Sequence, residues 1–171
     1  MGRSGKKWDA GWYHRRSMLL KGELEQMFLG QYQHNLDDKG RLTIPSVFRD
    51  ALAEGAFITQ GLDRNLMVMT VSYFQKVYDR LNSMSITDPS TRMLKRLVLS
   101  TAYKMEMDKA GRILVPLSLR EFLNVSGVSL VGQGEYFEIW PSNEWEAQAL
   151  NLQDTESNSQ RFAMLDLSTN E

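Results

Sequence analysis

Short runs in which apolar and polar residues alternate recur along most of the chain, and turn-forming residues separate them. Alternation with a period of two is typical of half-buried β-strands. The runs predict strands over residues 32–36, 42–44, 57–60, 66–69, 103–107, 113–115, 129–131 and 136–140. Many short strands between turns indicate a mainly β fold with a few helices.

Other stretches place apolar residues three and four positions apart, the spacing of an amphipathic helix. Pro45 and Pro116 each precede such a stretch, and proline is tolerated at the first position of a helix. Two further helices are predicted, one around residues 74–81 and one after Asp88-Pro89, an N-cap followed by proline. The apolar positions of the four helices are, in order, Val47, Phe48, Ala51 and Leu52; Leu119, Phe122 and Leu123; Phe74, Val77, Tyr78 and Leu81; and Met93, Leu94, Leu97 and Val98, a stripe that faces the core or a second subunit.

Two parts of the chain repeat each other at an offset of 71 residues. The segment Asp37–Pro45 matches Asp108–Pro116. The same offset pairs residues on both sides without a gap: Tyr32 with Tyr103, Arg49 with Arg120, Leu52 with Leu123, Gly61 with Gly132, Leu66 with Phe137, Val68 with Ile139 and Phe74 with Trp145. Such agreement indicates an internal duplication. One copy is marginal for a core of its own, so the two copies are expected to bury a shared face as a pseudo-dimer.

Each copy centres on a tight turn with the pattern Asp-x-x-x-Arg. Gly40 and Gly111 supply the positive φ that such turns often need. The carboxylates of Asp37 and Asp108 are placed to accept backbone N–H bonds within the turn, or to pair with the arginine four residues later and fix its rotamer. The turn is therefore either an ordinary solvated turn or the support for a functional arginine.

The functional interpretation is recognition of double-stranded DNA. Arg41 and Arg112 suit a bidentate contact with guanine O6 and N7, whereas Lys39 and Lys109 suit phosphate as point charges. A two-stranded ribbon fits the major groove. Charge is also polarised along the chain: residues 27–132 carry thirteen basic and ten acidic residues, and residues 133–171 carry one basic and eight acidic. That division is consistent with a DNA-facing surface away from the acidic end, or with a solvated acidic tail that has no functional consequence.

An enzyme is the first rival interpretation, with Asp37 and Asp108 as an acid–base pair. Both lie in basic turns that favour ionisation, which speaks against a raised pKa. The chain has no cysteine, so thiolate catalysis is excluded, and His14 and His34 lack metal-ligand spacing. We expect no cofactor, no metal, no small-molecule substrate and no catalysis. A protein-binding assembly or antitoxin-like adaptor module is the second rival.

In its motifs the chain resembles the MraZ family of transcriptional regulators. The resemblance rests on Asp37–Pro45 and Asp108–Pro116 together with Met27–Tyr32, Phe48-Arg49, Asp88-Pro89, Leu119-Arg120, Leu130–Gly132 and Phe137–Trp140. It implies an α+β, mainly β fold of tandem AbrB-like swapped-hairpin repeats, with Asp37 and Arg41, and Asp108 and Arg112, as the signature. Thr101 departs from the family, where glycine is common before Ala102.

The resemblance also implies a function. Proteins of this family assemble into a ring-shaped homo-oligomer, expected here to be an octamer, and bind short repeated boxes in the promoter of their own operon, the division and cell-wall cluster. The expected location is cytoplasmic and nucleoid-associated, with no membrane partner.

The predicted divisions are a first repeat with a linking helix at 27–97, a second repeat at 98–150 and a polar, mobile tail at 151–171. Residues 1–26 match neither repeat. They are interpreted either as a basic arm or as a mis-annotated start, because the codons for Lys21-Gly22-Glu23 can spell a ribosome-binding sequence shortly before Met27.

Overall fold

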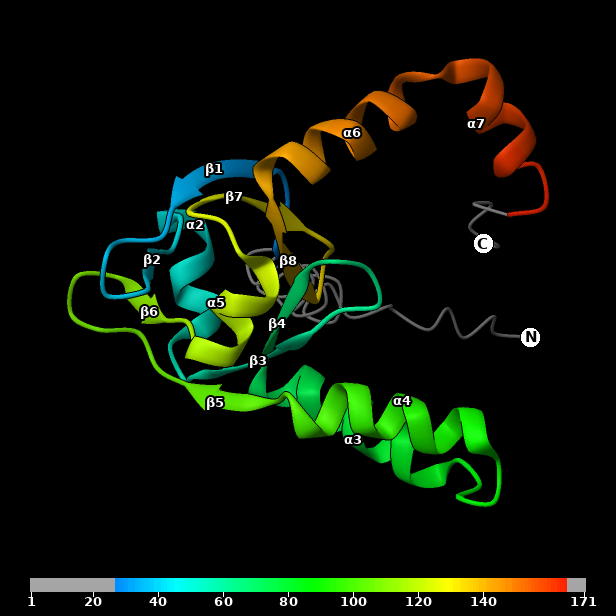
Figure 1. The fold of residues 1–171 in the computed structure, drawn as a ribbon, viewed down its shortest axis with the longest axis horizontal. Helices are drawn as coiled ribbons and strands as arrows, with labels where there is room; N and C mark the ends of the chain where they lie inside the picture. The colour runs from blue at the N-terminus through cyan, green and yellow to red at the C-terminus, as the bar shows by residue number, and fades with distance from the viewer. Residues whose placement is uncertain (1–26, 166–171) are drawn as a thin grey trace, which may run out of the picture.

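A computed structural model describes residues 27–165 and shows an antiparallel six-stranded sheet beside a separate two-stranded ribbon (Figure 1). The predictions made for residues 1–26 lie outside the described residues. The sheet has the order β1-β7-β8-β4-β3-β5. Its strands are β1 (Gln31–Asn35), β3 (Ala56–Gln60), β4 (Leu66–Thr70), β5 (Tyr103–Met105), β7 (Gly127–Gly132) and β8 (Tyr136–Pro141). The ribbon joins β2 (Arg41–Thr43) to β6 (Arg112–Leu114).

The order of the strands follows from the duplication. Strands β1, β3 and β4 belong to the first repeat, and β5, β7 and β8 are their counterparts in the second. Strand β1 pairs with β7 and β5 pairs with β3, so each repeat gives its first strand to the other. Strands β4 and β8 pair at the centre of the sheet. The expected swapped-hairpin pseudo-dimer, an α+β fold that is mainly β, is confirmed.

The strand exchange separates segments that are adjacent in the sequence. Between β1 and β2 the first repeat keeps a single bridge, Leu36 with Leu42, before the two strands enter different sheets. Beyond that bridge β2 pairs with β6, with Leu42 opposite Ile113. The alternation of residues alone could not show this, because it indicates which face of a strand is buried but not which strand lies beside it.

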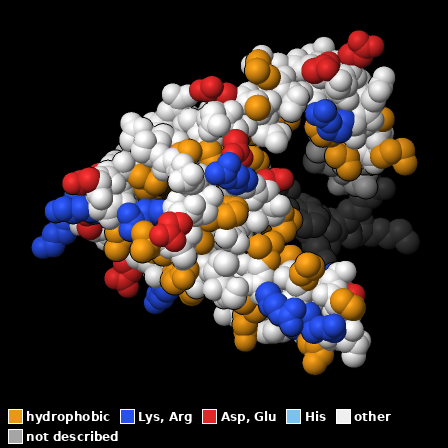
Figure 2. All heavy atoms as spheres, viewed as in Figure 1, with side chains coloured by type: hydrophobic (Ala, Val, Ile, Leu, Met, Phe, Trp, Pro, Cys, Tyr) orange, Lys and Arg blue, Asp and Glu red, His pale blue; other side chains and the backbone are white. Residues whose placement is uncertain are grey.

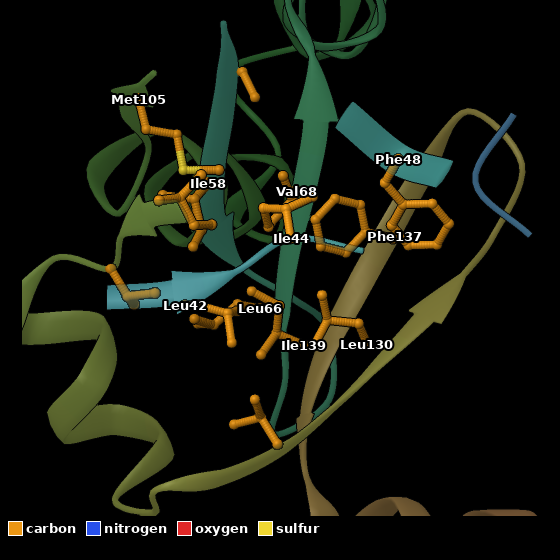
Figure 3. Close-up of a cluster of buried hydrophobic side chains, with 14 of the residues drawn as sticks. Leu42, Ile44, Phe48, Ile58, Leu66, Val68, Met105, Leu130, Phe137 and Ile139 are labelled. Atoms are coloured by element: carbon orange, nitrogen blue, oxygen red, sulfur yellow. The ribbon is translucent and has the colours of Figure 1, made fainter. Parts of the chain in front are cut away.

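An apolar core formed by described residues lies between the sheet and the ribbon (Figure 3). The side chains of Leu42, Ile44, Ile113 and Val115 enter it from the ribbon segments, and those of Ile58, Val68 and Ile139 from the sheet. Its aromatic centre joins both repeats: the Phe28 ring lies 5.1 Å from both the Phe48 and Phe137 rings. The two repeats therefore share their buried surface.

Short helices cover the ribbon side of the core. α2 (Ser46–Arg49) continues into the 3-10 turn η1 (Asp50–Leu52), and α5 (Leu117–Leu123) is its counterpart. Phe48 and Leu52 are buried as expected, as are Leu119 and Leu123. The expectation for Val47 was wrong: this side chain is 60% exposed, because α2 is a single turn that presents only one narrow face to the core.

Longer helices lie against the other face of the sheet. They are α3 (Val71–Ser83), α4 (Pro89–Ser100) and α6 (Ser142–Gln153). Phe74 of α3 stacks on Phe57 with centroids 4.0 Å apart, and Tyr73 stacks on Tyr136 at 5.6 Å. Asp88 caps α4 with Pro89 in its first turn, as predicted. In the expected apolar stripe of α4, Leu94, Leu97 and Val98 are partly buried, whereas Met93 is exposed.

Thr101, the departure from the family pattern, closes a buried polar contact between α4 and β3. Its hydroxyl lies 2.7 Å from the Thr59 hydroxyl and accepts a bond from the backbone N–H of Gln60. Thr59 in turn lies 2.7 Å from the carbonyl of Val98. The threonine therefore satisfies groups that glycine would leave to other partners.

The segment expected to be a polar tail is helical over its first part. Residues 151–153 complete α6, and α7 (Thr155–Arg161) follows. Asp154 caps α7 by accepting a bond from the backbone N–H of Ser157. Within residues 27–165 no helix is long and apolar enough to cross a lipid bilayer.

The gapless register of the repeat was also wrong, at one point. Burial and pairing make Ala56 and Ile58 the counterparts of Val128 and Leu130, an offset of 72 rather than 71. Gly132 therefore matches Gln60 and not Gly61. The additional residue lies just after α5, where Asn124 takes a left-handed conformation with φ of 51°. A shorter connection between β7 and β8 then restores the offset of 71, so that Leu66 and Phe137 are both buried counterparts.

Candidate nucleic-acid interface

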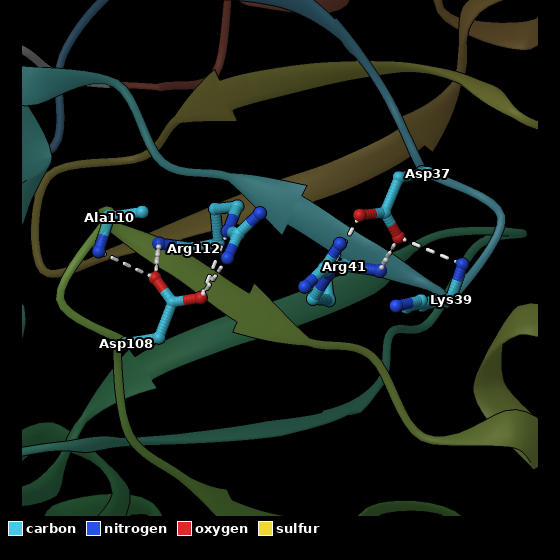
Figure 4. Close-up of polar contacts among 6 residues, drawn as sticks. All are labelled: Asp37, Lys39, Arg41, Asp108, Ala110 and Arg112. Carbon is cyan, nitrogen blue, oxygen red and sulfur yellow. Dashed lines mark hydrogen bonds and ion pairs between the residues drawn. The ribbon is translucent and has the colours of Figure 1, made fainter.

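The two Asp-x-x-x-Arg turns lie at the ribbon formed by β2 and β6 (Figure 4). We call Asp37–Arg41 the first turn and Asp108–Arg112 the second turn. Each is closed by the same pair of backbone bonds. In the first turn the N–H of Asp37 donates to Arg41 O at 2.9 Å and the N–H of Gly40 to Asp37 O at 2.9 Å. In the second turn the corresponding distances are 2.8 and 2.9 Å.

The aspartate of each turn binds both the backbone and the arginine. Asp37 Oδ1 accepts the N–H groups of Lys39 and Arg41 at 3.0 and 2.8 Å, and its Oδ2 accepts Arg41 Nε–H at 2.7 Å. Asp108 repeats the arrangement with Ala110 and Arg112, at 2.9 and 3.0 Å to the backbone and 2.9 Å to Arg112 Nε. One carboxylate thus holds the turn and the arginine side chain together.

These bonds keep both carboxylates ionised. The backbone N–H of Arg41, followed by the Arg41 side chain, lowers the pKa of Asp37 below its ordinary value of 3.8. The pKa of Asp108 is lowered in the same direction, mainly by the side-chain bond from Arg112. An acid–base pair needs one carboxyl with a raised pKa. The geometry therefore gives no support to the enzyme interpretation.

Both turn glycines have a backbone that other residues rarely adopt. Gly40 has φ of 76° and Gly111 has φ of 74°, values in the left-handed region where glycine carries no steric cost. Both are buried.

The arginines extend from the outward face of the ribbon. Leu42 and Ile113 are 0% and 2% exposed and point into the core. Since side chains alternate along a strand, Arg41 and Thr43 on β2, and Arg112 and Leu114 on β6, share the opposite face. Arg41 binds its aspartate through Nε, and Arg112 through Nε and Nη2. At least one terminal nitrogen of each arginine has no hydrogen-bond partner among the described residues.

The two lysines named from the sequence are not equivalent. Lys39 is the third residue of the first turn, where the second turn has Ala110, and Lys109 stands where the first turn has Asp38. Both are exposed. Lys and Arg side chains lie beside Asp and Glu at this end of the molecule (Figure 2).

Two further arginines lie at the site although the sequence did not predict them as site residues. Arg49 of α2 and Arg120 of α5 each lie against the turn glycine of the opposite repeat. The sequence offered two signals for them, their match at the offset of 71 and their place in the motifs Phe48-Arg49 and Leu119-Arg120. A role in the turns required knowing that the strands exchange.

Other candidate chemistry is weak in the described part of the chain. No group of three or more His, Cys, Asp and Glu side chains there could hold a metal ion. His34 is partly buried on β1, and this burial lowers the pKa of its ring below 6.5. It pairs with Val128 in the sheet, in agreement with a packing role.

Comparison with known proteins identifies the family. Residues 27–97 and 98–167 both match the model of a family described as "MraZ protein, putative antitoxin-like". The chain is 44% identical to Transcriptional regulator MraZ of Roseiflexus castenholzii over 121 residues, which cover 70% of this chain and 85% of that relative. It is 40% identical to the protein of the same name from Thermomicrobium roseum over 141 residues, 81% of this chain and 99% of the relative. The two repeats, their paired Asp-Arg turns and these matches together show that the chain belongs to the MraZ family.

Proposed function

We propose that this chain is a transcriptional regulator that binds double-stranded DNA through the β2–β6 ribbon, with Arg41 and Arg112 reading base edges. The observation that carries the proposal is the presentation of these two arginines. Both extend from the outward face of one ribbon, and each is held by its own aspartate with a terminal nitrogen left unpaired among the described residues. The names of the relatives support the regulatory role.

The geometry suits the major groove. Arg41 lies opposite Leu114 and Arg112 opposite Thr43, so the two arginines occupy diagonal positions, with Cα atoms about 7–8 Å apart. A major groove about 12 Å wide accepts such a ribbon. The aspartates reduce the side-chain freedom that each arginine must lose on binding, because the rotamer is fixed in advance. Lys39 and Lys109 are exposed and are proposed to contact phosphates.

A single ribbon offers a small contact area, so tight binding needs several copies. We infer that the chain assembles as a ring-shaped homo-oligomer that engages repeated boxes upstream of its own operon, and that it acts at the nucleoid. Exposed apolar side chains on two outlying parts support self-association. They are Ile86 and Met93 at the end of the α3–α4 pair, and Leu150, Phe162 and Leu165 on the α6–α7 arm.

The alternative is a non-catalytic adaptor that binds proteins, which the words "antitoxin-like" in the family description favour. DNase footprinting on the DNA upstream of the chain's own gene, followed by binding across a salt series, separates the two. A regulator protects short repeated segments, and the logarithm of its binding constant falls linearly with the logarithm of the salt concentration. The absence of protection at micromolar protein would contradict the proposal and favour the adaptor.

A further inference from the structure

Arg49 and Arg120 each contact the turn of the opposite repeat. A Cβ atom added at Gly40 would lie 2.5 Å from Cζ of Arg120, and one added at Gly111 would lie 2.5 Å from Cζ of Arg49. The guanidinium of each helix arginine therefore fills the space directly beside the turn glycine of the other repeat. The arrangement is reciprocal, because Arg49 and Arg120 occupy the same position in the two copies.

The contact is a second reason why each of the two positions requires glycine. Positive φ already favours glycine at both positions. In addition, any side chain would collide with an arginine that comes from the other half of the molecule. The conformation of each turn, and with it the direction of Arg41 or Arg112, is thus limited by the opposite repeat.

The two helix arginines are held differently. Arg49 Nε–H donates to Ile44 O at 2.9 Å, which ties it to the chain just after β2. Arg120 Nε is buried and has no hydrogen-bond partner among the described residues. It lines an open hollow of about 450 Å³ together with Asp37 of the first turn. Arg120 therefore holds the first turn by packing against it. Arg49 also packs against a turn, but its own side chain is held by the hydrogen bond to Ile44 O.

We propose that Arg49 and Arg120 are positioning residues, each fixing the DNA-reading turn of the opposite repeat. Arg120 sets the first turn for Arg41, and Arg49 sets the second turn for Arg112. The inference rests on the proposed DNA-binding function for its consequence, but the contact itself is independent of DNA. Each reading turn is then a composite of both repeats, because its conformation depends on an arginine of the other repeat.

The contact is tested by amide hydrogen exchange on the full chain. In each turn the glycine N–H donates to the aspartate carbonyl at 2.9 Å, so its exchange reports the order of that turn. Arg120→Ala should accelerate exchange at Gly40 by about tenfold or more and leave Gly111 unchanged. Arg49→Ala should do the reverse. Equal acceleration at both glycines, or a change in the turn of the same repeat, would overturn the proposal.

Double-mutant cycles supply a second, independent measurement. The effect of Gly40→Ala on the unfolding equilibrium should be at least about threefold smaller in an Arg120→Ala background, because the collision is gone. The effect of Gly111→Ala on the unfolding equilibrium should be reduced in the same way in an Arg49→Ala background. The pairs within one repeat, Gly40 with Arg49 and Gly111 with Arg120, are the matched controls and should be additive. Coupling of the same size in those controls would contradict the contact of each arginine with the turn of the opposite repeat.

The consequence for DNA is tested with Arg120→Gln, which loses both the charge and the planar guanidinium group. The probes are the fragment upstream of the chain's own gene and a shuffled fragment of equal length. Discrimination between them should fall by about tenfold while the salt slope stays constant. A slope reduced by about 1 with discrimination intact would make Arg120 a phosphate contact and overturn the positioning role. A wild-type chain that does not discriminate would refute the proposed function, whereas the exchange measurement would still decide the contact.

Discussion

Leu42 lies directly opposite Ile113 in the antiparallel pair of β2 and β6, and the two residues occupy the same position in the two repeats. A pseudo-twofold axis therefore passes through the ribbon. Since both side chains are buried, the axis also runs through the core. The two repeats meet at the ribbon from which the candidate DNA-reading arginines extend, so the site forms only when both repeats are folded together.

The shared aromatic centre should make the fold sensitive to one side chain of α2. Phe48 is 1% exposed and contacts Phe28, Tyr32 and Phe137. Phe48→Ala should cost about 3–5 kcal/mol of unfolding free energy, from lost burial and the cavity left behind. The control, Val47→Ala, removes an exposed side chain and should change it by less than about 0.5 kcal/mol. Urea unfolding measures both, and similar losses would contradict the core described above.

The hydroxyl of Thr59 should contribute to stability through the contact with α4. Thr59→Val keeps the shape but leaves the Thr101 hydroxyl and the Val98 carbonyl without this partner. A loss of about 1–3 kcal/mol is expected in urea unfolding, because buried polar groups become unsatisfied. Thr43→Val, at an exposed position of the ribbon, is the control. An unchanged free energy of unfolding for Thr59→Val would show that the polar contact is not needed to hold α4 against β3.

The turn carboxylates predict how stability responds to acid. Since the pKa of Asp37 and that of Asp108 are lowered in the folded state, each stabilises the fold at pH values above the ordinary 3.8. This contribution disappears as the pH falls through the lowered folded values. The Tm of the wild type should therefore exceed that of the Asp37→Asn, Asp108→Asn variant at about pH 7 and approach it near about pH 3. A constant difference across that range would argue against the charge-dependent bonds.

Much of the fold follows from local pattern. The strands, the proline-led helices and the Asp88 cap lie where alternation, helical spacing and capping chemistry place them, to within a few residues. The positive φ of Gly40 and Gly111 follows from the turn that their neighbours form. These features depend on residues close together in the sequence, which is why local sequence patterns predict them.

Features that depend on partners far away in the chain were less accessible. Val47 satisfied a helical pattern, but the helix proved too short to bury it. The register after α5 slips by one residue at Asn124, which a match of glycines at Gly61 and Gly132 concealed. Arg49 and Arg120 gained a role only because the strand exchange brings each helix to the opposite turn.

Binding to repeated boxes should depend on valence. A probe with one box should bind at least about a hundredfold more weakly than a probe with correctly spaced boxes, because each further ribbon binds at a high effective concentration. Altering the spacing by about half a helical turn should remove most of that gain. Sedimentation of the free protein at micromolar concentration supplies the control. A monomer, or equal affinity for both probes, would contradict assembly on repeated sites.

Equilibrium binding of the single and double alanine variants to the upstream fragment shows whether Arg41 and Arg112 read DNA from one ribbon. Each single change should cost about 1–3 kcal/mol and relax sequence preference. Arg80→Ala on α3, away from the ribbon (Figure 1), is the control and should bind like the wild type. We expect the double variant, Arg41→Ala with Arg112→Ala, to fold normally by circular dichroism and no longer to distinguish the upstream from the shuffled fragment. A folded double variant that binds both fragments as the wild type does would contradict it.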